Sequence, residues 1–195
     1  MSFVTGWPTV NPTVLACSLA GRHTSGSWQA GGEDRKDVAR DIIRRALDSG
    51  ADVLIIDVAG RGSDYGLRPG DPELVFDVSC EAAALKVHEF GNDQTAPRRF
   101  VVVDDADVIA QDPEAEGLVR ELDRLLHMGR SLSTTVVLSG EQPVVQWATQ
   151  IGGKVARLTG EDGLVRVFGA EVQELQVTAI PVQDVREAFE RARAE

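Results

Sequence analysis

Short apolar runs alternate with segments of helical periodicity along this chain of 195 residues. Short, predominantly apolar runs are typical of strands that are buried on both faces of a parallel sheet. Such runs span residues 12–20, 51–57, 100–104 and 134–138. In other segments apolar residues recur every three to four positions, which predicts helices over 34–48, 79–90, 113–128 and from 181 onward. Strands separated by helices favour right-handed crossovers and a mainly parallel sheet in an α/β protein.

The C-terminal third carries a different strand pattern. Residues 154–158 and 164–168 are short strand signals separated by the polar, glycine-containing stretch 159–163, whose composition indicates a hairpin turn. A last strand is expected over 172–180. We therefore predict a C-terminal antiparallel strand pair beside the parallel sheet.

Composition narrows the class of protein. The chain is 43% hydrophobic and has a net charge of −11, which argues against a stand-alone DNA-binding module; nucleic acid would be met only through the pore of an oligomer. No apolar run approaches the roughly 18 residues of a membrane span, and the first residues do not resemble a secretory signal. Cys17 and Cys80 are expected to be reduced, buried thiols rather than zinc ligands or a disulfide. We expect a cytoplasmic protein without a membrane partner.

The segment after the first strand has the glycine spacing of a phosphate-binding loop. Gly21 and Gly26 match the pattern G-x-x-x-x-G-K-[ST], but Ser27 and Trp28 stand in the lysine and hydroxyl positions. A lysine brings a cation to the β- and γ-phosphates and the hydroxyl binds Mg²⁺, so both contributions are missing at these positions. Arg22 is a further candidate for placing charge near a phosphate. We interpret these five residues as a weakened nucleotide-binding loop, with a plain strand-to-helix turn as the alternative.

Two carboxylates, Asp104 and Asp105, follow the third strand. An apolar strand ending in acids is the Walker B pattern of P-loop ATPases, in which the first acid supports Mg²⁺ and the second positions the attacking water. We assign the metal role to Asp104 and the catalytic role to Asp105, whose side chain is shorter than the more usual glutamate. Ligands of such sheets bind beyond the carboxyl ends of the strands, where both residues are expected to lie. Many buried strands end in an acidic turn, which is the alternative interpretation.

Taken together, these segments resemble the motor domain of the FtsK/SpoIIIE family of ATPases, in particular its EccC-like members of type VII secretion. The resemblance covers nearly the whole chain and is carried by residues 20–26, 57–62, 101–105, 125–132, 137–143 and 151–157. It implies one domain over residues 1–195 with a P-loop NTPase-like, three-layer αβα fold. It also implies a mainly parallel central sheet with the C-terminal antiparallel pair.

The resemblance extends to partners and further site residues. Members of the family form rings or chains with ATP between neighbours, so a protein partner or a homo-oligomer is implied. Arg130 and Lys154 would lie at such an interface, although the family has an arginine at the position of Lys154. Glu141 takes a sensor-like position, but Gly140 and Glu141 replace the Thr-Gln pair that senses the γ-phosphate. No resident cofactor is expected, and ATP with Mg²⁺ would be required if the chain is active.

Three hypotheses follow from this distribution of changes. The residues that depart from the family pattern are those expected to bind and hydrolyse ATP, whereas the strand pattern is kept. This favours a non-hydrolysing binding or assembly module in a DNA-translocation or secretion-type complex. The retained pair Asp104 and Asp105 keeps open a weak or atypical Mg-dependent ATPase. The third hypothesis is an unrelated doubly wound protein in which these residues are ordinary loop chemistry.

Overall fold

The computed structural model describes residues 14–18, 33–57, 62–76, 79–93, 98–128, 131–140, 154–158, 164–168, 172–176 and 180–194. The strands are β1 (Val14–Ser18), β2 (Asp52–Asp57), β3 (Leu74–Val75), β4 (Arg99–Asp104), β5 (Thr134–Gly140), β6 (Lys154–Leu158), β7 (Leu164–Phe168) and β8 (Val172–Gln176). The α-helices are α1 (Glu33–Asp48), α2 (Cys80–Asn92), α3 (Ala106–Gln111), α4 (Glu116–Met128) and α6 (Val182–Ala192), and short 3-10 turns are η1 (Ser63–Tyr65) and η2 (Pro113–Ala115). None of the helices in these ranges is long and apolar enough to cross a membrane.

The strands form one sheet in the order β3-β2-β4-β5-β1-β6-β7-β8. Every pairing from β3 through β6 is parallel, whereas β7 runs antiparallel to both β6 and β8. The predicted α/β class with a mainly parallel sheet is therefore confirmed. The central strands β2, β4 and β5 carry the apolar runs recognised in the sequence, since each is covered by helices on both sides.

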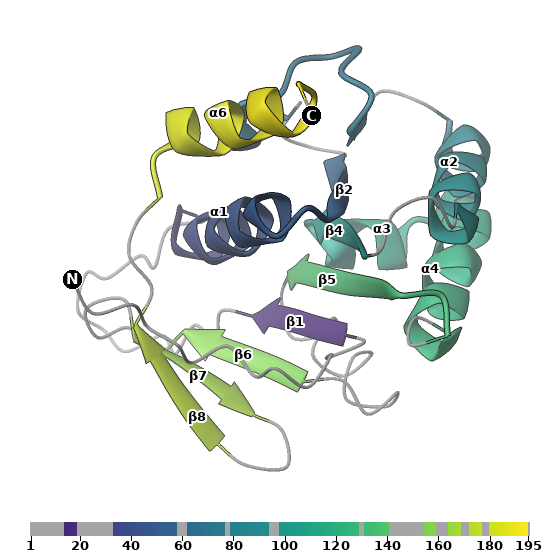
Figure 1. The fold of residues 1–195 in the computed structure, drawn as a ribbon. Coiled ribbons are helices and arrows are strands. Elements are labelled where there is room, and N and C mark those ends of the chain that lie inside the picture. The colour runs from purple at the N-terminus through teal and green to yellow at the C-terminus, as the bar shows by residue number, and fades with distance from the viewer. Residues whose placement is uncertain are drawn as a thin grey trace.

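Alternation along the central strands builds two hydrophobic layers. In β2, Val53 and Ile55 pack with α1 and α6, whereas Leu54 and Ile56 face α2 and α4. Figure 1 shows the same division: α6 lies along α1 on one side of the sheet, and α2 and α4 lie together on the other. This arrangement matters for the site, because the side of the sheet that a strand-end residue faces decides which helix can reach it.

Two helix ends agree with the stop and cap residues predicted from the sequence. Gly50, the expected stop after α1, has a φ of 74° and its N–H donates to Leu47 O at 2.9 Å. Ser79 caps α2 by accepting a hydrogen bond from Ala82 N–H at 3.2 Å. The elements that the pattern did not predict are α3, η1 and β3, which are too short to show a periodicity. The last strand, expected to reach residue 180, is described as ending at Gln176.

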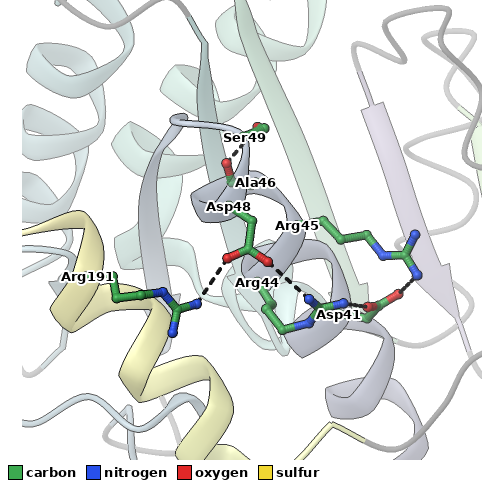
Figure 2. A network of polar contacts seen from close by, with 7 residues as sticks. All are labelled: Asp41, Arg44, Arg45, Ala46, Asp48, Ser49 and Arg191. Atoms are coloured by element: carbon green, nitrogen blue, oxygen red, sulfur yellow. Dashed lines mark hydrogen bonds and ion pairs between the residues drawn. The ribbon is translucent and has the colours of Figure 1, made fainter. Parts of the chain in front are cut away.

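A network of ion pairs joins the C-terminal half of α1 to α6 (Figure 2). Asp41 accepts a hydrogen bond from Arg44 at 3.2 Å and forms an ion pair with Arg45 at 2.8 Å. Arg44 also binds Asp48 at 3.0 Å, and Arg191 of α6 binds the other oxygen of Asp48 at 3.1 Å. The network therefore starts at a buried carboxylate and ends at an exposed contact between the two helices.

The difference in burial gives a matched pair of substitutions. Asp41→Ala removes a side chain that is 5% exposed and bound by two arginines, so we expect it to lower the free energy of unfolding by about 1–3 kcal/mol. Asp48→Ala removes a carboxylate that is 42% exposed and should cost less than about 1 kcal/mol. Chemical denaturation of both variants beside the unmodified chain measures this, and equal losses would contradict the assigned difference.

Candidate functional site

Two buried carboxylates lie side by side at the carboxyl ends of neighbouring strands. Asp57 ends β2, Asp104 ends β4, and the two are register partners. Both are about 1% exposed. Because Val53 and Ile55 face α1, the alternation of β2 places Asp57 on that same side of the sheet. The carboxylates are thus directed toward the helix that follows the glycine-spaced loop.

Only part of the hydrogen-bonding capacity of this pair is used by neighbouring backbone. Asp57 Oδ2 accepts a hydrogen bond from Gly62 N–H at 2.8 Å, and Asp104 accepts one from Asp105 N–H at 3.1 Å. The second oxygen of Asp104, Oδ2, is buried and has no hydrogen-bond partner among the described residues. Leaving a buried polar atom unsatisfied costs roughly 1–3 kcal/mol, so a group that bonds to Asp104 Oδ2 would be favoured there.

Two further buried hydroxyls share this property. Tyr65 Oη and Ser139 Oγ are both buried without a hydrogen-bond partner. Ser139 follows Leu138, which pairs with Val103, so the ladder brings Ser139 beside Asp104. The ends of β2, β4 and β5 therefore carry a row of polar side chains, of which Asp104 and Ser139 each have a buried oxygen with no hydrogen-bond partner in the described part of the chain. Ligands of open α/β sheets bind at such strand ends.

Tyr65 reaches this row from η1. Burial raises the pKa of the Tyr65 phenol well above its ordinary value, and the negative charge of Asp104 raises it further. Asp104 also acts on this pKa as an acceptor for the phenol hydroxyl, so the two groups are close neighbours even though neither Tyr65 Oη nor Asp104 Oδ2 has a partner in strict hydrogen-bond geometry. The phenol is consequently neutral under physiological conditions and is able to donate a proton in a hydrogen bond.

A cation reaches the same region from the first turn of α1. Lys36 Nζ donates a hydrogen bond to Asp64 Oδ2, and Arg40, one turn later, donates to the carbonyl oxygen of Asp64 at 2.7 Å. Partial burial works to lower the pKa of Lys36, but the hydrogen bond and the nearby carboxylates outweigh it and raise the pKa above 10.5. Those carboxylates are Asp104, Asp64 and Asp57. Lys36 therefore stays charged and partly neutralises the acidic strand ends.

The turn that carries Tyr65 is held by close packing against α6. Gly62 and Gly66 flank η1, both with positive φ, 75° and 72°. A Cβ on Gly66 would lie 2.7 Å from Arg186 Cβ and 3.1 Å from Val182 O. A glycine is required at 66 for two reasons, the left-handed backbone and the approach of α6.

The structure places the two predicted acids differently. Asp104 lies at the centre of the row of polar side chains. Asp105 is half-buried, has a left-handed φ of 46° and immediately precedes α3. A positive φ at a non-glycine residue costs free energy and is often found at functional sites. The metal role of Asp104 and the catalytic role of Asp105 stay predictions.

The other predicted site residues lie largely outside the described part of the chain. This holds for Gly21, Arg22, Gly26, Ser27, Trp28, Arg130 and Glu141. Lys154 opens β6 and pairs with Leu15 of β1 in the sheet, and its side chain is not among those described. The described part of α1 begins at Glu33, downstream of Trp28, so the helix turn nearest the acids carries Lys36.

Sequence reasoning missed Lys36, Asp64, Tyr65 and Ser139 as members of this site. Tyr65 is the chain's only tyrosine and lies in a glycine-rich stretch, which was a usable signal. Lys36 was harder to find, because a lysine one turn into an amphipathic helix is usually an exposed side chain. Its role depends on the distance between α1 and η1, and sequence spacing does not give that distance.

The residues of this row fit a metal only in part. Among the described residues, no group of three or more His, Cys, Asp or Glu side chains is placed to hold a metal ion. Mg²⁺ at nucleotide sites is commonly held by one or two carboxylates together with phosphate oxygens and water. Asp104 Oδ2 is suited to be one such ligand, and a nucleotide would have to supply other oxygens.

Solved structures share this fold at low sequence identity. The cytoplasmic domain of the type VII secretion ATPase EccC from Thermomonospora curvata is 13% identical with a TM-score of 0.55, over 86% of this chain and 24% of that one. A protein described as an ATPase is 14% identical with a TM-score of 0.54, over 87% of this chain and 80% of that one. The genome packaging NTPase B204 from Sulfolobus turreted icosahedral virus 2, in complex with ATP-gammaS, is 12% identical with a TM-score of 0.50, over 87% and 100%.

These similarities define the fold of the chain as that of P-loop ATPase domains. The chain spans about a quarter of the EccC structure, 24%, and the full length of the packaging NTPase. The sequence matches no protein-family model, and the comparison with curated proteins finds no match.

The packing of Gly66 on α6 predicts a difference between two glycine substitutions. Gly50 and Gly66 have nearly the same φ, 74° and 72°, but a Cβ at Gly50 meets nothing within 4 Å. Gly50→Ala should therefore cost only the backbone strain, about 1–2 kcal/mol. Gly66→Ala should cost about 1–3 kcal/mol more, because α6 has to move. Thermal or chemical unfolding of both variants measures the difference, and equal costs would show that α6 does not press on this turn.

Tyr65→Phe tests the environment of the buried phenol. At neutral pH the variant should be within about 1 kcal/mol of the parent, because the lost hydroxyl lies beside Asp104 without a partner in strict hydrogen-bond geometry among the described residues. Above pH about 10 an unfolded tyrosine loses its proton whereas folded Tyr65 keeps it, so the parent's stability should fall as pH rises, and more steeply than the variant's. Unfolding free energies measured from pH 7 to 11 check this. Curves that stay parallel would mean that Tyr65 ionises equally easily in both states.

Proposed function

We propose that the chain is a non-hydrolysing, FtsK/SpoIIIE-type ATPase-like domain that serves as a binding or assembly module. The observation that carries the proposal is the internal pairing of Lys36 with Asp64. The loop positions that normally supply a lysine and a hydroxyl hold Ser27 and Trp28. The one lysine described near the acids is thus already bound by a carboxylate of its own chain.

The energetic consequence of this arrangement is large for hydrolysis and small for folding. Phosphoryl transfer depends almost entirely on positioning and on stabilising charge that develops on the phosphate oxygens. Each 1.36 kcal/mol of lost stabilisation lowers the rate about tenfold, so a missing cation and a missing metal-binding hydroxyl are enough to suppress turnover. The chain's own groups offset part of the charge at the strand ends, since Gly62 and Asp105 donate backbone hydrogen bonds to the two acids and the ammonium group of Lys36 lies close enough to act on their charge.

The setting that we propose is a secretion-type or DNA-translocation complex, in the cytoplasm, with a protein partner or further copies of the chain. Support comes from the similar folds, which are described as a type VII secretion ATPase and a genome packaging NTPase. In this proposal Arg130 and Lys154 contribute to the contact between subunits, and Glu141 occupies the sensor position without binding a phosphate.

A second candidate function is favoured by one specific observation. The unpartnered Oδ2 of Asp104 is the atom that would bind Mg²⁺ or its water in an active site. If nucleotide drew Lys36 away from Asp64, the same lysine would supply a cation to the phosphates. The chain would then be a weak, atypical Mg-dependent ATPase in which Asp105 positions the attacking water.

Calorimetric titration with Mg·ATP and a phosphate-release assay separate the two candidates. For the assembly module we expect a dissociation constant weaker than about 1 mM and no phosphate release above buffer. Asp104→Asn should then change neither readout. Asp184→Asn serves as the control, because it makes the same change at an exposed position on α6. Turnover that disappears in Asp104→Asn but persists in Asp184→Asn would establish the ATPase instead.

Lys36→Met adds a readout that does not require activity. If Lys36 acts as an internal counter-ion, Lys36→Met lowers the free energy of unfolding and leaves ATP affinity at its background value. If Lys36 holds phosphate, the substitution removes a measurable ATP affinity that the parent chain has. The second result would overturn the assembly-module proposal.

A further inference from the structure

The contact between Lys36 and Asp64 lies at the surface of the candidate site. Lys36 Nζ, early in α1, donates a hydrogen bond to Asp64 Oδ2 and forms an ion pair with it. The two side chains are 22% and 33% exposed, whereas Asp57 and Asp104 are each about 1% exposed. A molecule from solution is therefore able to reach Lys36 without opening the hydrophobic core.

The turn that carries Asp64 holds this carboxylate in place. Arg40, one helical turn after Lys36, donates to Asp64 O at 2.7 Å. Gly62 and Gly66 flank the turn with positive φ values of 75° and 72°, and Gly66 packs closely on α6. A carboxylate on such a short connection competes with free anions at an effective concentration on the order of 1 mM or more. Asp64 is thus a strong internal competitor for any anion that Lys36 could bind.

A lysine recognises a carboxylate and a phosphate in the same way. Both offer anionic oxygens to charge-assisted hydrogen bonds from the ammonium group. Lys36 keeps its positive charge: partial burial lowers its pKa, but the hydrogen bond to Asp64 and the charges of nearby carboxylates raise the pKa overall. The ammonium group therefore has the chemistry to bind a phosphate oxygen, and the chain uses it for a carboxylate of its own.

We propose that Asp64 is an autoinhibitory residue that occupies Lys36 in place of a phosphate group. The excluded ligand is a polyphosphate that carries Mg²⁺, because the neighbouring Asp57 and Asp104 repel an anion whose charge is not balanced. Lys36 is released when the charge of Asp64 is removed or when another cation binds its carboxylate. The inference rests on the proposed function, and it names the contact that keeps the nucleotide affinity of this site low.

Asp64→Asn tests this contact by a gain of affinity. The substitution keeps the size of the side chain and removes its charge, so Lys36 becomes available to a ligand. Calorimetric titration of the full chain with Mg·ATP and with Mg·tripolyphosphate should show at least about tenfold tighter binding by the variant than by the parent. We expect the gain with both ligands, because the phosphate oxygens and not the base are recognised. A gain with ATP alone would overturn the inference.

Three further variants make the result specific. Asp48→Asn removes another carboxylate of a surface ion-pair network, which binds Arg44 and Arg191, and should leave the affinity at the parent value. Asp64→Glu keeps the negative charge and should bind no more tightly than the parent. Lys36→Met combined with Asp64→Asn should abolish the gain. Circular dichroism checks that each variant is folded, and Asp64→Ser, which also removes the charge, replaces Asp64→Asn if that variant does not fold.

The inference and the proposed function fail on different results. Unchanged affinity in Asp64→Asn, or an equal gain in Asp48→Asn, would overturn the autoinhibitory role and leave the proposed function intact. A gain that survives the loss of Lys36 would also overturn it, since another group would then bind the phosphate. The proposed function fails instead if the parent chain itself binds Mg·ATP tightly and releases phosphate.

Discussion

β2 and β4 run in parallel register from Asp52 opposite Arg99 to Asp57 opposite Asp104. This pairing buries valine and isoleucine side chains on both faces, so it fixes which residues meet α1 and which meet α2 and α4. A slip of either strand by one residue would exchange its two faces and turn its terminal carboxylate toward the other side of the sheet. The rest of the molecule is arranged around this register, since β3, β5 and the helices all pack against these two strands.

The register also creates the electrostatic problem that the surrounding segments resolve. Two adjacent buried carboxylates repel each other and have lost most of their contact with water. The structure compensates with backbone donors from Gly62 and Asp105 and with the ammonium group of Lys36. In a nucleotide-dependent enzyme a metal would contribute to this compensation. A cation from the chain itself offsets part of this charge, and that is the physical basis of our proposal that the domain is an assembly module.

The two ends of β2 therefore differ in what they offer to other molecules. The carboxyl end carries buried, partly unsatisfied polar atoms, with Tyr65 held against it by α6. The amino end borders a cavity whose lining includes Asp52, Glu89 and Asp93.

The amino-acid sequence by itself determined the strand and helix pattern, the parallel class of the sheet and the position of Asp104 at a strand end. These features depend on local periodicity and on the β–α order, which a single chain displays directly. Tertiary structure alone decided that Lys36 and Tyr65 belong to the site. Each depends on how near one segment comes to another that is distant in the chain, and the packing of η1 against α1 and α6 sets those distances.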